Sequence, residues 1–186
     1  MNINKLILLL LMLVCTSLVA AKEDSQYLLT EKTYKALSAA QELIAEDDYS
    51  KAETQLKALL KKVKEKPYEA AVVQQTLGYL YSSQENYKTA AIFFQSALDS
   101  SALPDKVSHN LRYNLAQLLL ADEQYKKGIA MLESWLKAEA TPANSAYVLL
   151  ASAYYRLKDF KQVIKHISTA IKNDESATEA WYQLLL

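Results

Sequence analysis

The chain has 186 residues, of which 51% are hydrophobic, and its 21 basic side chains are balanced by 21 acidic ones. A balanced charge argues against nucleic-acid binding, because a phosphate backbone is usually met by a concentrated basic face. Only two glycines and three prolines occur, while Ala, Leu, Lys, Glu and Gln are abundant, and this composition predicts an all-α protein.

Residues 1–21 have the layout of a secretory signal peptide, which makes the periplasm the expected location. A single basic residue, Lys5, precedes an apolar stretch from Leu6 to Val14, and Val19-Ala20-Ala21 comes just before a charged segment. We expect cleavage after Ala21. The alternative is an uncleaved anchor in the inner membrane, with the rest of the chain facing the periplasm, since Cys15-Thr16-Ser17-Leu18 lengthens the apolar stretch.

The mature chain is expected to begin with a lead-in at residues 22–32 and to continue as one helical domain at 33–186. Cleavage removes Cys15, the only cysteine, so no disulfide can form in the mature protein. Its stability then depends on apolar burial, for which the chain is long enough. No Asn-x-Ser/Thr sequon occurs, which fits a bacterial periplasm better than a eukaryotic secretory route.

Four short segments share one pattern: a polar turn, an aromatic residue, two spacers and a small or short apolar residue. The aromatics stand at positions 49, 87, 125 and 160, so their spacings are 38, 38 and 35 residues. A period of about 34 residues with two helices per unit is typical of tetratricopeptide repeats, and the chain resembles that family. The second unit, with Leu77-Gly78-Tyr79-Leu80-Tyr81, also has its leucine, glycine and later aromatic where the family has them.

This resemblance implies an all-α solenoid of antiparallel helix pairs that winds into a right-handed superhelix. We expect four full repeats, at approximately residues 33–70, 71–108, 109–143 and 144–177, and the first helix of a fifth at 178–186. That last helix has Trp181, Leu184 and Leu185 on its packing face and lacks the polar outer face of a terminal repeat. Two interpretations stay open: the chain continues as a longer array, or the last helix is a short cap.

Cap residues mark several expected helix starts. Ser50 with Glu53, and Asp159 with Gln162, have the spacing of a capping box. Thr141-Pro142 places a cap residue before a proline that could open a helix. These cap residues predict that helices begin near residues 50, 142 and 159.

Two other features have a structural interpretation. Gly128 stands where the other units have a small or short apolar side chain, and we expect it to allow close contact between helices, at about 1 kcal/mol of helix propensity. The lysine-rich run at residues 61–66 could be a basic patch for a membrane or an acidic partner. We interpret it as a solvated helix end, where lysines meet the negative end of the helix dipole.

No arrangement of residues points to catalysis, so we expect a protein that is not an enzyme and binds no cofactor. His109 and His166 lie in different units, and neither has the neighbouring ligands that a metal site needs. We interpret both as core or surface residues. Gly78 and Gly128 lie 50 residues apart, so the chain has no glycine-rich phosphate loop.

In the family, the functional surface is the concave groove lined by the first helix of each repeat. The resemblance therefore implies partner-binding candidates on those helices, where tyrosines and amides suit an extended peptide or a partner helix. The alternative for each tyrosine is that it fills the inside of the bend between repeats. The candidates are Gln75, Tyr79, Asn110, Tyr113, Asn114, Gln117, Ser152, Tyr155, Arg156 and Tyr182.

The leading hypothesis is a non-enzymatic periplasmic scaffold that binds a partner protein or peptide in this groove. The export signal, the repeats and the segments RYNLAQLLL and AWYQLLL resemble exported tetratricopeptide proteins described as accessory components of TonB energy-transduction systems. That resemblance implies periplasmic regions of TonB, ExbB or ExbD as partners, and membrane association only through a partner or an uncleaved anchor. Two alternatives remain: a factor for assembly of pili, the outer membrane or polysaccharide export, and the repeat region of a longer protein with a domain after Leu186.

Overall fold

The computed structural model describes residues 27–173 and residue 181, and this part of the chain contains eight helices and no strand. The predicted signal peptide at 1–21 and the candidate Tyr182 lie outside the described residues. The predicted fifth-repeat helix at 178–186 lies outside them too, apart from Trp181. No described helix is long and apolar enough to cross a membrane.

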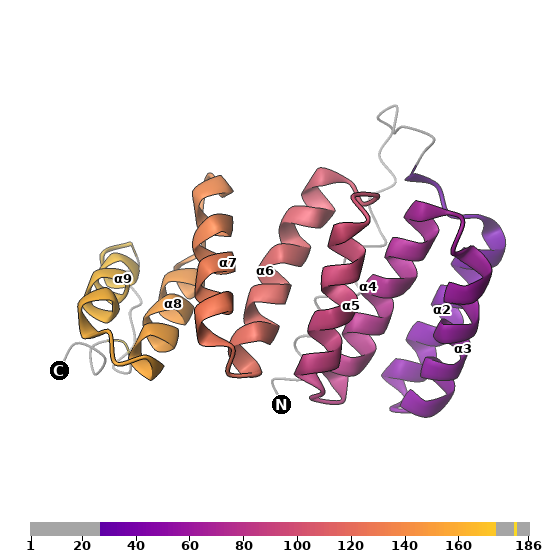
Figure 1. Cartoon of the computed structure of the whole chain (residues 1–186), viewed down its shortest axis with the longest axis horizontal. Coiled ribbons are helices and arrows are strands. Elements are labelled where there is room, and N and C mark those ends of the chain that lie inside the picture. The colour runs from indigo at the N-terminus through magenta and orange to yellow at the C-terminus, as the bar shows by residue number, and fades with distance from the viewer. Residues whose placement is uncertain (1–26, 174–180, 182–186) are drawn as a thin grey trace. The chain divides into compact units, whose positions relative to one another are not determined.

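The helices form two compact units, divided between Asp105 and Lys106, and each unit consists of two antiparallel helix pairs in chain order (Figure 1). Unit 1 contains α2 (Glu31–Ala45), α3 (Tyr49–Val63), α4 (Pro67–Ser83) and α5 (Tyr87–Asp99). Unit 2 contains α6 (Asp105–Ala121), α7 (Tyr125–Ala138), α8 (Asn144–Arg156) and α9 (Phe160–Lys172). In unit 1, α3 packs against both α2 and α4, α4 packs against α5, and α2 also contacts α4. In unit 2, α8 packs against α7 and α9.

All four helix pairs are closed by the same turn. The residue two positions before each recurring aromatic has a left-handed backbone, and the next residue donates its amide N–H to the carbonyl five positions earlier, as Asp48 does to Leu43 at 2.8 Å. This is the Schellman arrangement, which satisfies the last carbonyls of the first helix. The repeated turn explains why the sequence pattern recurs most clearly there. The left-handed residues are Asp47 (φ 61°), Glu85 (58°), Glu123 (58°) and Lys158 (60°).

The predicted capping box at Ser50 and Glu53 is wrong. Helix α3 begins at Tyr49, and its cap is Asp48, whose side chain accepts the N–H of Lys51. The turn places the cap immediately after its left-handed residue, so Ser50 already lies inside the helix, where its carbonyl accepts a hydrogen bond of 2.9 Å from the Thr54 hydroxyl. Glu53 is then free to bond other side chains.

The cap predicted at Asp159 is confirmed, because its Oδ1 accepts the N–H of Gln162 at 3.3 Å. The return bond of a capping box is missing among the described residues: the buried Oε1 of Gln162 has no partner, and the Asp159 N–H donates to the carbonyl of Tyr154. The start predicted at Thr141-Pro142 is wrong, since α8 begins at Asn144. Thr141 belongs to the preceding loop, where its N–H donates to Glu139 Oε1 at 3.4 Å.

The two glycines allow close approach of helices within each unit. An added Cβ on Gly78 of α4 would overlap the buried ring of Phe94 on α5. A Cβ on Gly128 of α7 would lie 2.6 Å from Leu120 Cγ and 3.2 Å from the carbonyl oxygen of Ala116, both on α6. The close contact predicted for Gly128 is therefore confirmed.

The core of unit 2 consists of two apolar clusters. In the first, Ala116 and Leu120 of α6 pack with residues of α7 and α8, including Trp135 and Leu150. In the second, Val163 and Ile167 of α9 join Ala151 of α8, and Trp181 packs against this cluster. Each fully buried leucine or isoleucine contributes about 1.5–3 kcal/mol of transfer free energy.

Candidate functional site

The groove candidates on α4 contact each other. Gln75 Nε2 donates a hydrogen bond of 3.4 Å to the Tyr79 hydroxyl, four residues along the helix. The rings of Tyr79 and Phe94 pack edge to face, with ring centroids 4.9 Å apart. Both candidates are half-buried. Tyr79 thus packs mainly within the α4/α5 pair, so less of its side-chain surface is available to a partner.

The candidates on α6 divide into exposed and half-buried residues. Asn110 and Gln117 are exposed, whereas Tyr113 and Asn114 are half-buried. The Tyr113 ring lies 4.5 Å from that of Trp135 on α7, measured between centroids. Tyr113 is therefore part of the packing between α6 and α7.

The candidates on α8 all face solvent. Ser152, Tyr155 and Arg156 are exposed, and Tyr155 retains 52% of its accessible surface. The rings of Tyr155 and Phe160 pack edge to face with centroids 6.0 Å apart, and Phe160 is itself 55% exposed. A broad aromatic surface beside an exposed guanidinium is therefore available at the end of α8.

A cluster that sequence reasoning missed fills the space between α6 and α7. His109 stacks on Trp135 with centroids 5.2 Å apart, and its Nε2 lies 2.9 Å from Glu139 Oε2. The hydrogen bond from His109, and then that from the Thr141 backbone, lowers the pKa of Glu139. His109 and Tyr113 are four residues apart on α6, so helical spacing could have placed these two on one face. Trp135 lies on α7, and Glu139 is the C-cap residue that follows α7.

Two tyrosines tie neighbouring helix pairs together. In unit 1, the Tyr81 hydroxyl on α4 donates 2.9 Å to Glu53 Oε1 on α3. In unit 2, the Tyr154 hydroxyl on α8 donates 2.6 Å to Glu133 Oε1 on α7. Burial, and then the hydrogen bond to Glu133, raises the pKa of Tyr154 to about 12. The hydrogen bonds from Lys57 and Tyr81 lower the pKa of Glu53.

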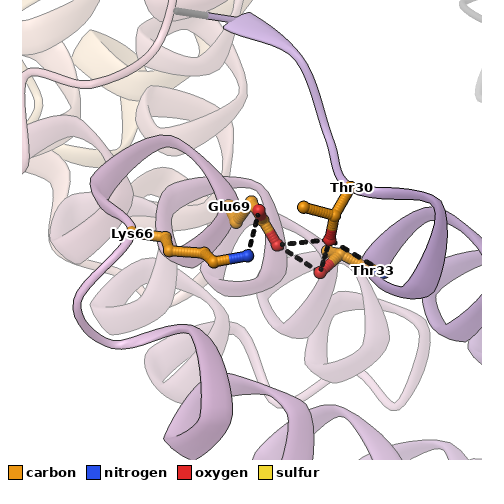
Figure 2. Close-up of polar contacts among 4 residues, drawn as sticks. All are labelled: Thr30, Thr33, Lys66 and Glu69. Atoms are coloured by element: carbon orange, nitrogen blue, oxygen red, sulfur yellow. Dashed lines mark hydrogen bonds and ion pairs between the residues drawn. The ribbon is translucent and has the colours of Figure 1, made fainter.

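A buried carboxylate joins the starts of α2 and α4 (Figure 2). Glu69, in the first turn of α4, is 5% exposed and accepts hydrogen bonds from the hydroxyls of Thr30 and Thr33 and from Lys66 Nζ at 2.9 Å. Burial raises the pKa of Glu69, but the hydrogen bonds from Thr33 and Lys66 outweigh it, so that the pKa lies below its ordinary value of 4.5. Because the Glu69 carboxylate accepts these hydrogen bonds from residues of the protein itself, Glu69 has a structural role, which is to link α2 to α4.

The histidines and other ligand-type residues form no metal site in the described part of the chain. No group of three His, Cys, Asp or Glu side chains is arranged there to hold an ion. His166 is 7% exposed and stacks on Tyr154 with centroids 5.6 Å apart, which makes it a core residue. His109 lies in the aromatic packing between α6 and α7.

No protein-family model matches the chain, and no curated protein matches it. Solved structures do. MamA (41 to the end) from Desulfovibrio magneticus RS-1 is 21% identical, with 85% of this chain and 84% of that chain covered and a TM-score of 0.69. The TPR-like repeats of a Podosopora anserina kinesin light chain are 14% identical over 83% of each chain, with a TM-score of 0.65. BtubC from P. vanneervenii is 18% identical, with 88% of this chain and 82% of that chain covered and a TM-score of 0.54.

These likenesses establish the fold. The chain has an all-α fold similar to that of tetratricopeptide-repeat solenoids, as the sequence pattern predicted. At this level of identity the likeness concerns the arrangement of helices and not the partner, because repeat proteins resemble one another through their packing positions.

Proposed function

We propose that this protein is a non-enzymatic scaffold that binds a peptide or a helix of a partner protein through the exposed face of its first helices. The proposed contact surface lies in unit 2, where it is called the α6/α8 face. It consists of Asn110 and Gln117 on α6 and Ser152, Tyr155 and Arg156 on α8.

The observation that carries this proposal is the exposure of Tyr155 and Arg156 next to a fully packed core. The inward positions of α8, including Leu150 and Ala153, are buried, while Ser152, Tyr155 and Arg156 are exposed. Tyrosine and arginine are enriched where proteins bind each other, since both offer large contact area together with hydrogen-bond donors. Amides such as Asn110 and Gln117 add adaptable hydrogen bonds to a peptide backbone.

The setting of the proposed scaffold is the periplasm, and its proposed partners are the periplasmic regions of TonB, ExbB or ExbD. The support for the setting is the signal-like layout of residues 1–21, and the support for the partners is the resemblance of the repeat segments to exported tetratricopeptide proteins of TonB systems. The alternatives of an envelope-assembly factor and of a repeat region within a longer protein predict different partners for the same face.

Site-specific crosslinking in the native host tests the proposal. A photoreactive phenylalanine analogue would replace Tyr155, and the matched control would carry it at Ser134, an exposed position on α7. We expect a discrete protein adduct at 155 that is absent at 134. Arg156→Ala should weaken the 155 adduct several-fold, whereas Lys165→Ala on α9 should not.

Mass spectrometry of the adduct then separates the finer hypotheses. An adduct with TonB, ExbB or ExbD supports the energy-transduction role. An adduct with a pilus, outer-membrane or polysaccharide-export protein supports the envelope-assembly alternative. The same diffuse products from positions 155 and 134 would overturn the α6/α8 face as a binding surface.

A further inference from the structure

Unit 1 carries a second surface feature that involves none of the groove candidates. A hollow of about 440 Å³ lies between α3 and α5 and is lined by Lys57, Leu60, Lys61, Lys64 and Phe93. Its volume is within the range of about 300–1,000 Å³ that is common for binding sites. We call it the lysine hollow.

The floor of the lysine hollow is apolar and held in place by Tyr81. The Tyr81 ring stacks on Phe93 with centroids 5.4 Å apart and an interplanar angle of 6°. The Tyr81 hydroxyl donates a hydrogen bond to Glu53. Lys57 Nζ lies 5.8 Å from the centre of the same ring. Because Tyr81 is only 8% exposed, this packing fixes Phe93 before any ligand arrives.

The rim of the hollow is basic because of helical spacing. Lys57, Lys61 and Lys64 stand at positions i, i+4 and i+7 of α3 and its end, so they lie on one face together with Leu60. Among the described residues, no acidic one lines the hollow. The lysine-rich run at residues 61–66 spans the end of α3 at Val63, as expected for a helix end, and Lys61 and Lys64 of this run also border the hollow.

The charges on the rim are available to a ligand. Lys57 pairs with Glu53 at 2.6 Å and Lys64 with Glu65 at 3.4 Å, both on the surface. Exposed pairs of this kind contribute about 0–1 kcal/mol each, so an incoming carboxylate can replace them at low cost. Lys61 has no carboxylate partner among the described residues.

We infer that the lysine hollow binds an acidic amphipathic segment of another protein. Carboxylates of the segment meet Lys57, Lys61 and Lys64, while one large apolar side chain rests against Leu60 and Phe93. Charge complementarity around an apolar anchor gives both attraction and register. An anionic lipid surface is less well matched, because such surfaces usually attract clusters of about four to eight basic residues, and this rim has three.

Fluorescence polarisation with a defined probe tests this inference on the full mature chain. The probe is a fluorescein-labelled peptide of about twelve residues in which glutamates flank a Leu-x-x-Phe pair on one helical face. We expect saturable binding that weakens, without vanishing, as salt is raised. A second peptide with serines in place of Leu and Phe should bind at least about tenfold more weakly, because it has no apolar anchor.

Two charge reversals on neighbouring lysines provide the matched comparison. Lys61→Glu should weaken probe binding by more than about tenfold, since it removes an attraction and adds a repulsion on the rim. Lys62→Glu changes the net charge equally, but Lys62 does not line the hollow, so we expect less than about a twofold change. Both side chains are exposed, and circular dichroism should show the same helicity for both variants.

Three outcomes would overturn the inference. Equal weakening by Lys61→Glu and Lys62→Glu would mean nonspecific charge attraction. Equal binding of the peptide without Leu and Phe would remove the apolar anchor. Lys61-dependent cosedimentation with phosphatidylglycerol–phosphatidylcholine vesicles, without binding of the probe peptide, would assign the hollow to a membrane surface.

Discussion

The hydroxyl of Tyr154 on α8 donates a hydrogen bond of 2.6 Å to Glu133 on α7 and so links two successive helix pairs. Tyr81 makes the equivalent bond to Glu53 in unit 1. Both tyrosines stand six residues before the recurring aromatic of their repeat, at positions 87 and 160, but their acceptors stand at different positions of the preceding helix. The two donors thus occupy the same position of their repeats, whereas the other two repeats have Leu43 and Leu119 there, and the position of the acceptor differs between the two pairs.

Removing the Tyr154 hydroxyl should destabilise the protein modestly. Tyr154→Phe keeps the ring on His166 and loses one hydrogen bond to a partly exposed carboxylate, which we expect to lower the free energy of unfolding by about 1 kcal/mol. Urea unfolding at neutral pH measures this change. Tyr147→Phe on the same helix is the control and should change stability by less than about 0.5 kcal/mol.

The same bond should be visible in an alkaline titration. The folded pKa of Tyr154 is raised from 10.0 to about 12, so its contribution to stability is complete below pH 10 and is lost as the pH rises through 12. Absorbance at about 295 nm follows tyrosine ionisation. The phase near pH 12 should be smaller in Tyr154→Phe than in the wild type, and an unchanged phase would contradict the raised pKa.

Acid should weaken the packing of α8 and α9 through His166. Burial, and then the charge of Lys165, lowers the pKa of His166 below 6.5, although Glu133 opposes this. The stability that the neutral ring provides is present above pH 6.5 and is lost as the pH falls toward the lowered folded value, because the unfolded chain takes up the proton first.

His166→Phe should therefore flatten the dependence of stability on pH. It keeps an aromatic ring against Tyr154 and Tyr147 and cannot be protonated. Urea unfolding at about pH 7.5 and about pH 5.5 would compare the variant with the wild type. If the loss of stability between these two values were as large in the variant as in the wild type, His166 would not be its source.

Glu69 should be the most important carboxylate of unit 1. Glu69→Gln breaks the ion pair with Lys66 and weakens the bonds from Thr30 and Thr33, and we expect a loss of about 1.5–3 kcal/mol in the free energy of unfolding. The loss should shrink in acid, because the stability due to the carboxylate disappears as the pH falls through a folded pKa below 4.5. Glu65→Gln, an exposed control, should cost less than about 0.5 kcal/mol.

Alanine should be harmful at both glycines despite its better helix propensity. The Cβ of Gly128→Ala would press on the branch atom of Leu120 and on a backbone oxygen, so we expect a net loss of about 1–2 kcal/mol. Gly78→Ala should cost more, because the buried ring of Phe94 cannot move aside. Thermal unfolding ranks the two, with Ser134→Ala on the surface of α7 as a neutral or stabilising control.

A glycine should be favourable at the left-handed turn residue Glu85. Glu85→Gly removes a steric cost of about 1–2 kcal/mol at φ 58°, against an entropy cost of about 0.4–1 kcal/mol in the unfolded chain. We expect a slightly higher melting temperature. Glu65→Gly, at a position without positive φ, should lower it, and equal effects of the two changes would contradict the strain at Glu85.

The spacing of apolar and aromatic residues was sufficient to predict the helices and the repeat. Tyr155 and Arg156, which the resemblance to the family implied as groove candidates, are exposed. Tyr113 is also on the expected helix, but its ring packs against that of Trp135, 22 residues away in sequence (positions 113 and 135). Helical periodicity says which face a residue occupies, and it cannot say whether a neighbour already fills the space in front of it.

Local turn chemistry was predictable only in part. The cap at Asp159 followed from its sequence spacing, whereas the cap of α3 lies at Asp48, two residues before the predicted Ser50. Both residue types cap helices well, so the choice between them depended on the Schellman turn, which places the cap just after the left-handed residue.

By itself, the sequence determined the number of described helix pairs and their order, because these depend on residue periodicity along one helix or one repeat. Only the tertiary structure decided that Glu69 meets Thr30, 39 residues away, and that the lysines of α3 border a hollow floored by Phe93 of α5. Those contacts depend on the distance between two helices and on the side-chain rotamers that fill the space between them. Neither can be deduced from the periodicity of a single sequence.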